Sequence, residues 1–219
     1  MRSKARFLLI LAVLPAIIIA TGCQKAYYST MEAFGKHKRD ILVDRVTDAR
    51  DAQNEAKEQF SSALDAFTAV VNVPDTDLRK QYDAMQSAYD ASSKKAEAVS
   101  SRIAGVKKVG SALFKEWESE LTQYDSDALR RSSEQKLHQT RGQYDQLIAA
   151  MERAESRIQP VLTAMNDQVL FLKHNLNAQA VASLQNELVT VETDVATLIR
   201  EMETAIAEAD TFISAMAQP

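Results

Sequence analysis

Residues 42–70 read LVDRVTDARDAQNEAKEQFSSALDAFTAV, and this stretch decides the fold. Its apolar and small residues recur at alternating steps of four and three, which is the a/d pattern of a coiled coil. Charged and other polar side chains fill most of the positions between them. Such a stripe is stable as a helix only when other helices bury it. The positions of this first seam are Leu42, Val46, Ala49, Gln53, Ala56, Phe60, Ala63, Phe67 and Val70.

Three later stretches carry the same pattern, and no alternating strand pattern occurs in the sequence. Together they predict helices over about 25–71, 78–124, 127–174 and 178–216, separated by short polar breaks around Pro74, Ser126 and Asn177. Short connections make neighbouring helices antiparallel. We therefore expect an all-α fold, an elongated antiparallel four-helix bundle with coiled-coil packing. The alternative is a pair of helical hairpins that bury their seams in an oligomer.

Three residues interrupt this regularity. Gly105 and Gly110 lie inside the second seam, where each glycine costs up to about 1 kcal/mol relative to alanine. They mark either a close helix crossing or a weak point. Pro160 lies inside the third seam and removes a helical hydrogen bond. Because the apolar register continues unshifted across Pro160, we expect a kinked helix there and not a loop.

The composition fits long helices. Only 5 of the 219 residues are glycine and 4 are proline, and this length corresponds to one domain or two small ones. The net charge is −4, and loss of the three basic residues before residue 7 would leave 23 basic against 30 acidic residues, about −7. A mildly acidic chain is a poor general nucleic-acid binder, because binding to phosphates needs a positive surface. With one cysteine, the chain forms no internal disulfide.

Residues 1–22 have the pattern of a signal peptide. Basic residues at positions 2, 4 and 6 precede an apolar run over residues 7–20, and small residues lead to Cys23. A lone cysteine after small residues resembles a bacterial lipobox, although Ala20 stands where a lipobox usually has leucine. We expect lipidation of Cys23, with residues 23–219 forming the mature helical bundle. The apolar run is shorter than the about 20 residues that a membrane span needs, so it fits a signal peptide better than an anchor. An uncleaved anchor is the alternative.

Residues close to Cys23 indicate where the protein lies. Gln24 follows the cysteine, whereas aspartate at that position is the usual signal for retention in the inner membrane of Gram-negative bacteria. We therefore expect an outer-membrane anchor with the bundle facing the periplasm. Aromatic and basic side chains near a lipid anchor suit the membrane interface and anionic headgroups or other polyanions. Helix-start packing and a solvated helix face are the alternatives. The residues concerned are Tyr27, Tyr28, Lys36, His37, Lys38 and Arg39.

No motif indicates catalysis, a cofactor or a metal. Residues 105–111 have the glycine spacing of a phosphate loop, but Ser111 stands where the loop needs lysine. The histidines are isolated, and the seams carry almost no carboxylates, with Glu120 the exception. Tyr89 and Trp117 lie on a seam, so we expect core packing for both. We expect a structural or protein-interaction module that is not an enzyme and has an envelope protein or a second copy as partner. The alternative is a bundle that binds a small apolar or anionic ligand near Gly105, Gly110 and Pro160.

The region 27–60 resembles an uncharacterised family of proteobacterial lipoproteins, domain of unknown function 2959. The most specific part is residues 35–46, GKHKRDILVDRV, and the resemblance covers most of the mature chain. It implies a Gram-negative envelope protein with helical, coiled-coil character. It supplies no activity and no catalytic residues.

Overall fold

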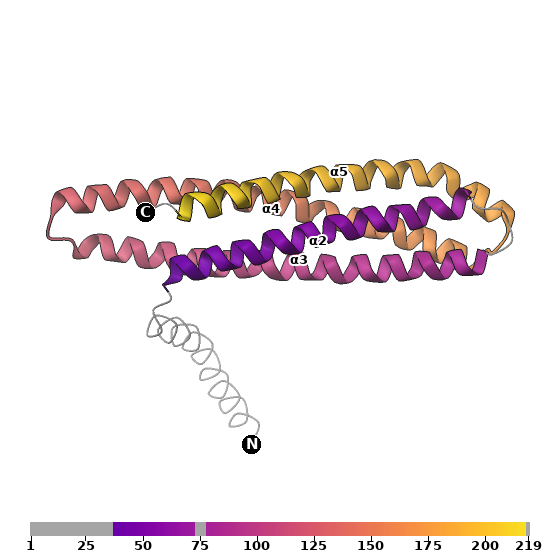
Figure 1. Ribbon diagram of the computed structural model, residues 1–219, viewed down its shortest axis with the longest axis horizontal. Helices are drawn as coiled ribbons and strands as arrows, with labels where there is room; N and C mark the ends of the chain where they lie inside the picture. Colours follow the sequence, from indigo (N-terminus) through magenta and orange to yellow (C-terminus); the bar gives the residue numbers. More distant parts are fainter. Residues whose placement is uncertain (1–36, 73–77, 218–219) are drawn as a thin grey trace, which may run out of the picture. The chain divides into compact units, whose positions relative to one another are not determined.

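The computed structural model describes residues 37–72 and 78–217, which form four α-helices (Figure 1). The helices are α2 (Lys38–Asn72), α3 (Leu78–Glu120), α4 (Asp127–His174) and α5 (Ala178–Ala217), and a short 3-10 helix, η1 (Leu121–Gln123), follows α3. No strand occurs in the described residues. The predicted all-α fold is confirmed.

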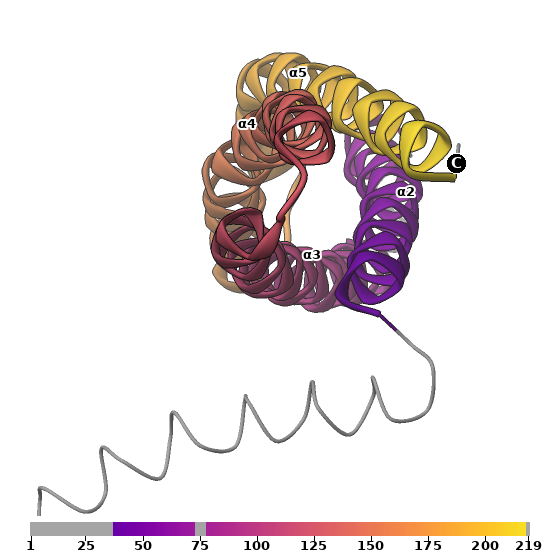
Figure 2. The same ribbon diagram turned by 90° about the vertical axis from the view of Figure 1, so that its left-hand side faces the viewer.

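The chain divides into two units, Met1–Ile41 and Leu42–Pro219. Within the second unit the helices lie around a shared centre in the order α2, α3, α4, α5 (Figure 2). Neighbours run antiparallel, because an ion pair between two helices recurs seven residues later in one and seven residues earlier in the other. Asp48–Arg102 and Glu55–Lys95 join α2 to α3, while Arg50–Asp210 and Lys57–Glu203 join α2 to α5.

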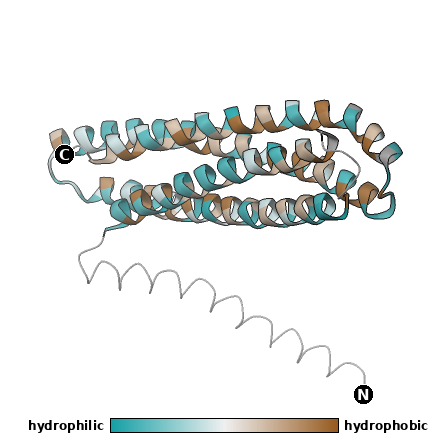
Figure 3. Cartoon of the chain, turned by 45° about the vertical axis from the view of Figure 1, so that its right-hand side comes forward, coloured by the Kyte–Doolittle hydropathy of each residue, from teal (hydrophilic) through white to brown (hydrophobic). Residues whose placement is uncertain are grey.

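The core of the second unit is built from the seams. All nine positions of the first seam are buried, and Phe60 and Leu42 have no exposed surface. Polar and apolar residues alternate around each helix (Figure 3), as expected when one stripe faces the centre. Because one chain buries its own seams, the structure matches the predicted bundle and not the pair of hairpins that needs an oligomer.

One polar residue of the first seam has no partner in the core. Gln53 is fully buried, and neither its amide nitrogen nor its amide oxygen makes a hydrogen bond. A buried polar group without a partner costs about 1–3 kcal/mol. Ser92, a buried polar residue of the second seam, does have a partner, since its hydroxyl donates a hydrogen bond to the backbone carbonyl of Ala88 at 2.8 Å. Gln53 is therefore a destabilising position in the core.

The helix ends follow local chemistry. Ser126 caps α4, since its hydroxyl accepts a hydrogen bond from the backbone N–H of Leu129 at 3.4 Å. α4 spans the residues that the sequence predicts, whereas α3 ends at Glu120 and its expected last turn is 3-10. Helix α4 is continuous through Pro160, which is exposed. The structure thus has a helix and not a loop at Pro160, and the expected kink stays a prediction.

The α3–α4 hairpin ends in a tip, residues 115–136, which contains no buried residue. Figure 1 shows this tip extending past the C-terminal end of α5. Trp117 lies in it, half-buried, and its indole N–H donates to the Ser133 hydroxyl at 2.8 Å. Tyr89 is also only half-buried, in α3. Trp117 and Tyr89 are therefore not among the fully buried core residues that the seam position predicted, and lie partly buried, which suits side chains that carry a polar group.

Candidate functional site

Several predicted site residues lie outside the described part of the chain. These are the signal peptide (residues 1–22), the lipidation site Cys23 with Gln24, the two tyrosines Tyr27 and Tyr28, and Lys36. The expected start of the first helix, near residue 25, also lies there. The functional assignments of these residues stay predictions.

The rest of the basic cluster starts helix α2. The backbone N–H of His37 donates to the Asp40 carboxylate at 3.1 Å, so Asp40 satisfies a donor at the helix start. His37 and Arg39 are exposed, whereas Lys38 is 9% exposed and counts as buried. Lysine buries its aliphatic stem readily. Among the described residues of the basic cluster, His37 and Arg39 are therefore the two at the surface.

Gly110 marks a close helix crossing. A Cβ atom added to Gly110 would lie 2.5 Å from the ring of Tyr144 on α4, whereas at Gly105 the nearest atom is the Arg45 Cδ at 3.8 Å. The Tyr144 ring also packs edge-on against Phe114 at 5.1 Å and Phe212 at 6.3 Å between centroids. Burial raises the pKa of Tyr144 to about 12. The crossing that the sequence indicated thus occurs at Gly110, with Tyr144 filling the space.

Ion pairs flank the α3–α4 contact and one position of the α4–α5 contact. Arg153 on α4 lies 3.7 Å from Glu201 on α5, with the pair at the edge of the seam. Fourteen residues later in α4 and fourteen earlier in α5, the same positions hold Asp167 and Glu187. Both of these residues are acidic, so Glu187 has no basic residue at the position where Glu201 has Arg153. The α3–α4 pairs are Lys107–Glu152 and Arg141–Glu118.

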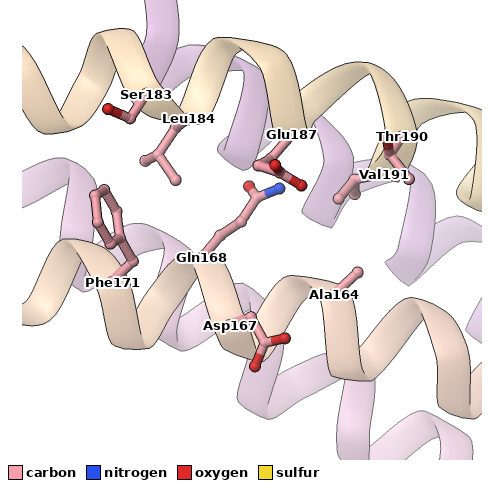
Figure 4. Close-up of a pocket in the computed structure, with 9 residues that line it drawn as sticks. All are labelled: Ala164, Asp167, Gln168, Phe171, Ser183, Leu184, Glu187, Thr190 and Val191. Carbon is pink, nitrogen blue, oxygen red and sulfur yellow. The ribbon is translucent and has the colours of Figure 1, made fainter.

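A groove of about 420 Å³ lies between α4 and α5 at these acidic positions (Figure 4). Its apolar lining includes Phe171, which is 40% exposed, and the buried residues Leu184 and Val191. Gln168 is buried, and its side chain extends from α4 toward α5 (Figure 4). This mixture of an apolar lining and a few polar groups is typical of binding sites. The lining residues are Ala164, Asp167, Gln168, Phe171, Ser183, Leu184, Glu187, Thr190 and Val191.

Sequence reasoning missed this groove, although one signal for it was present. Residues 169–172 form a dense apolar cluster, VLFL, of which the seam pattern needs only Leu172. Val169 is buried as well, while Leu170 is 48% and Phe171 40% exposed. A large apolar residue that lies off the seam points to a surface contact. The α5 residues that line the groove could not be identified from the sequence, because that requires the register of α4 against α5.

The described residues contain neither a group of three or more potential metal ligands nor a helix long and apolar enough to cross a membrane. Glu120, the carboxylate on the extended second seam, is exposed in the tip. His138 and His174 are exposed as well. Ionisable side chains in the described part of the chain thus line helix surfaces, and many of them form ion pairs between helices.

No curated protein matches the chain. A family model described as "Protein of unknown function (DUF2959)" matches residues 27–216. The match covers all four described helices and stops one residue before the end of α5. The chain therefore belongs to the DUF2959 family of proteins of unknown function.

Proposed function

We propose that this protein is a lipid-anchored envelope protein whose helical bundle acts as a structural and protein-interaction module. The observation that carries the proposal is the complete burial of the first seam, including Phe60 and Phe67, within one chain. Because the helices bury each other's seams, the core needs no partner to cover it, which supports a role for the outer surface in binding. The protein acts in this proposal by binding and not by catalysis.

A small-ligand carrier is the second candidate, and the geometry at the glycines argues against its expected location. The Tyr144 ring fills the space above Gly110, and Arg45 lies at ordinary contact distance from Gly105. Pro160 is exposed on α4 and does not open the core. The groove between α4 and α5 is the remaining place for a ligand, and it lies at the surface.

The proposed location rests on the residues around Cys23. Lipid on Cys23 would attach the N-terminus to a bilayer, and glutamine at position 24 favours the outer membrane. Tyr27 and Tyr28 would then lie within a few residues of the headgroups, where amphipathic aromatic rings are favoured. The basic residues Lys36, His37 and Arg39 would follow close to the same surface. The bundle would face the periplasm.

The anchor is tested with single substitutions in the full chain. Cys23→Ser should abolish labelling by radioactive palmitate and release the protein from membranes. Gln24→Asp should keep the label and move the protein to the inner membrane fraction, whereas the control Gln24→Ser should stay in the outer membrane fraction. Labelling of the Cys23→Ser variant would contradict the proposed anchor. An unchanged distribution of Gln24→Asp would contradict the proposed location.

The interaction role is tested in cells by photo-crosslinking from the anchored protein. A photoreactive residue is placed in turn at exposed positions, one on each helix and one in the tip, for example at Val189 and Leu129. We expect at least one helix face to crosslink reproducibly to a single protein, and the neighbouring face of the same helix not to do so. Absence of crosslinks from every position would contradict an interaction module.

A further inference from the structure

The groove between α4 and α5 has the dimensions of a short helix contact. Its lining spans residues 164–171 on α4 and 183–191 on α5, so each wall is about two turns or 10–12 Å long at 1.5 Å per residue. Two antiparallel helices with an apolar furrow between them are a common receptor for a third helix, which inserts one or two side chains per turn. The groove therefore accommodates about two turns of a partner helix.

The α5 wall carries acidic residues in register with the groove. Glu187, Asp194, Glu201 and Glu208 recur every seven residues and therefore lie on one face of α5. Glu201 pairs with Arg153 of α4. Glu187 has Asp167 at the corresponding position of α4, and neither carboxylate forms an ion pair within residues 37–72 and 78–217.

This arrangement contrasts with the other helix contacts of the bundle. Between α2 and α3, α2 and α5, and α3 and α4, an acidic residue on one helix faces a basic residue on the other. Asp167 on α4 and Glu187 on α5 both line the groove, and Figure 4 shows the Asp167 carboxylate on the side of α4 away from α5. One carboxylate on each wall, beside an exposed Phe171, therefore indicates a surface whose complementary charge and apolar side chain come from another molecule.

We propose that this groove docks an amphipathic helix of a partner protein, with lysine or arginine residues on both sides of its apolar stripe. The apolar stripe covers Phe171, and the basic residues pair with Asp167 on one wall and Glu187 on the other. This inference rests on the proposed interaction function and adds the chemistry of the partner. The same carboxylates repel anionic lipid headgroups, so the groove is not a membrane-contact surface.

The first experiment measures binding of a synthetic probe to the full-length protein in nanodiscs. The probe is a fluorescent 14-residue peptide of leucine, alanine and lysine, with leucine at a/d positions and lysine beside them; a matched peptide has glutamate for lysine. We expect saturable binding of the lysine peptide, weakened about tenfold by the double change Asp167→Asn with Glu187→Gln, since complementary charges across an interface set affinity and partner choice. The control pair, Asp145→Asn with Glu192→Gln, removes the same charges from exposed positions of α4 and α5 outside the groove and should change binding less than about twofold.

Two outcomes of that experiment overturn the proposal. One is equal binding by the groove variant and the control variant, which would mean that the peptide senses only net charge. The other is equal binding of the glutamate peptide. Phe171→Ser tests the apolar contribution to binding separately. It should weaken binding of the lysine peptide and leave the salt dependence of that binding unchanged.

A second experiment identifies the occupant in cells. A photoreactive residue at Thr190, in the groove, should crosslink to a partner protein, and the Asp167→Asn with Glu187→Gln variant should lose this product. The same residue at Val189, which is 62% exposed and outside the groove lining, should not form it. A crosslinked product with the mass of two copies of this chain would assign the groove to self-association and overturn the proposal. Crosslinks from other faces, with none from Thr190, would refute the groove and leave the proposed interaction function standing.

Discussion

The four-helix part of the bundle and the tip of the α3–α4 hairpin share one sequence pattern and differ in burial. In the four-helix part the helices lie around a shared centre (Figure 2), and residues such as Phe60 have no exposed surface. In the tip, residues 115–136, the seam continues through Trp117 and Glu120, but no residue is buried. The heptad pattern therefore defines which face of a helix is able to be buried. The number of neighbouring helices defines how much of that face is buried.

The largest difference between the two regions should come from truncating an apolar side chain in each. Phe60→Ala should lower the free energy of unfolding by about 3–5 kcal/mol, because it removes a fully buried ring and leaves a cavity. Leu129→Ala in the tip, where the side chain is 60% exposed, should change it by less than about 0.5 kcal/mol. Denaturation by urea, followed by circular dichroism, measures both. Equal losses would show that the tip contributes a core of its own.

The next effect concerns the close crossing near the boundary of the two regions. Gly110→Ala should destabilise the protein by about 1–3 kcal/mol, because the new methyl group overlaps a Tyr144 ring that Phe114 and Phe212 hold in place. The control Gly142→Ala, on the same helix as Tyr144, meets no atom within 4 Å and should stabilise by up to about 1 kcal/mol. Thermal unfolding separates the two. A stabilising Gly110→Ala would mean that the ring moves freely.

Gln53 provides a change of opposite sign in the core. Gln53→Leu should raise the free energy of unfolding by about 1–2 kcal/mol, because it removes two unsatisfied buried polar atoms and keeps the volume similar. The same substitution at Gln135, an exposed residue of the tip, should give no gain. Chemical denaturation measures stability, and sedimentation checks that the variant stays in one oligomeric state. A destabilised Gln53→Leu protein would indicate that the amide has a partner, such as a buried water molecule.

The smallest effect concerns how the free energy of unfolding depends on pH, which we compare for substitutions of a half-buried tyrosine and of a tyrosine in the tip. The folded protein holds the pKa of Tyr144 at about 12, above the ordinary value of 10.0, mainly through burial. The contribution to stability is therefore complete below pH 10 and is lost as the pH rises through 12. Between pH 9 and 11.5, Tyr144→Phe should lose about 1 kcal/mol less stability than the unchanged protein. Tyr124→Phe, at an exposed position of the tip, should follow the unchanged protein.

The sequence predicted the seams well because burial by neighbouring helices is a periodic property. Every residue from Leu42 to Val70 that the heptad pattern selected is buried, and the predicted polar break around Ser126 lies at the start of α4, which Ser126 caps. The errors occur at aromatic residues with a polar group. Trp117 and Tyr89 lie on the seam but are only partly buried, because a polar group favours a position at the edge of the core. The pattern does not distinguish an edge position from a central one.

The candidate groove was beyond sequence reasoning for a related reason. The residues 167, 168 and 171 are local to α4, and 184, 187 and 191 are local to α5, yet the groove exists only through the offset between the two helices. A shift of one turn would bring other residues to the groove. Only the packed register, marked by the Arg153–Glu201 pair, brings Asp167 and Glu187 to the same groove.

By itself, the sequence determined that this chain forms long helices with one buried stripe each, where the breaks between them lie, and that Cys23 is the candidate lipid anchor. These features depend on spacing along the chain, on capping residues and on local composition. The tertiary structure decided which helices are neighbours, that Tyr144 fills the space at Gly110, and that Asp167 and Glu187 line one groove. Those features depend on the relative positions of residues far apart in the sequence, which only the packing of complete helices defines.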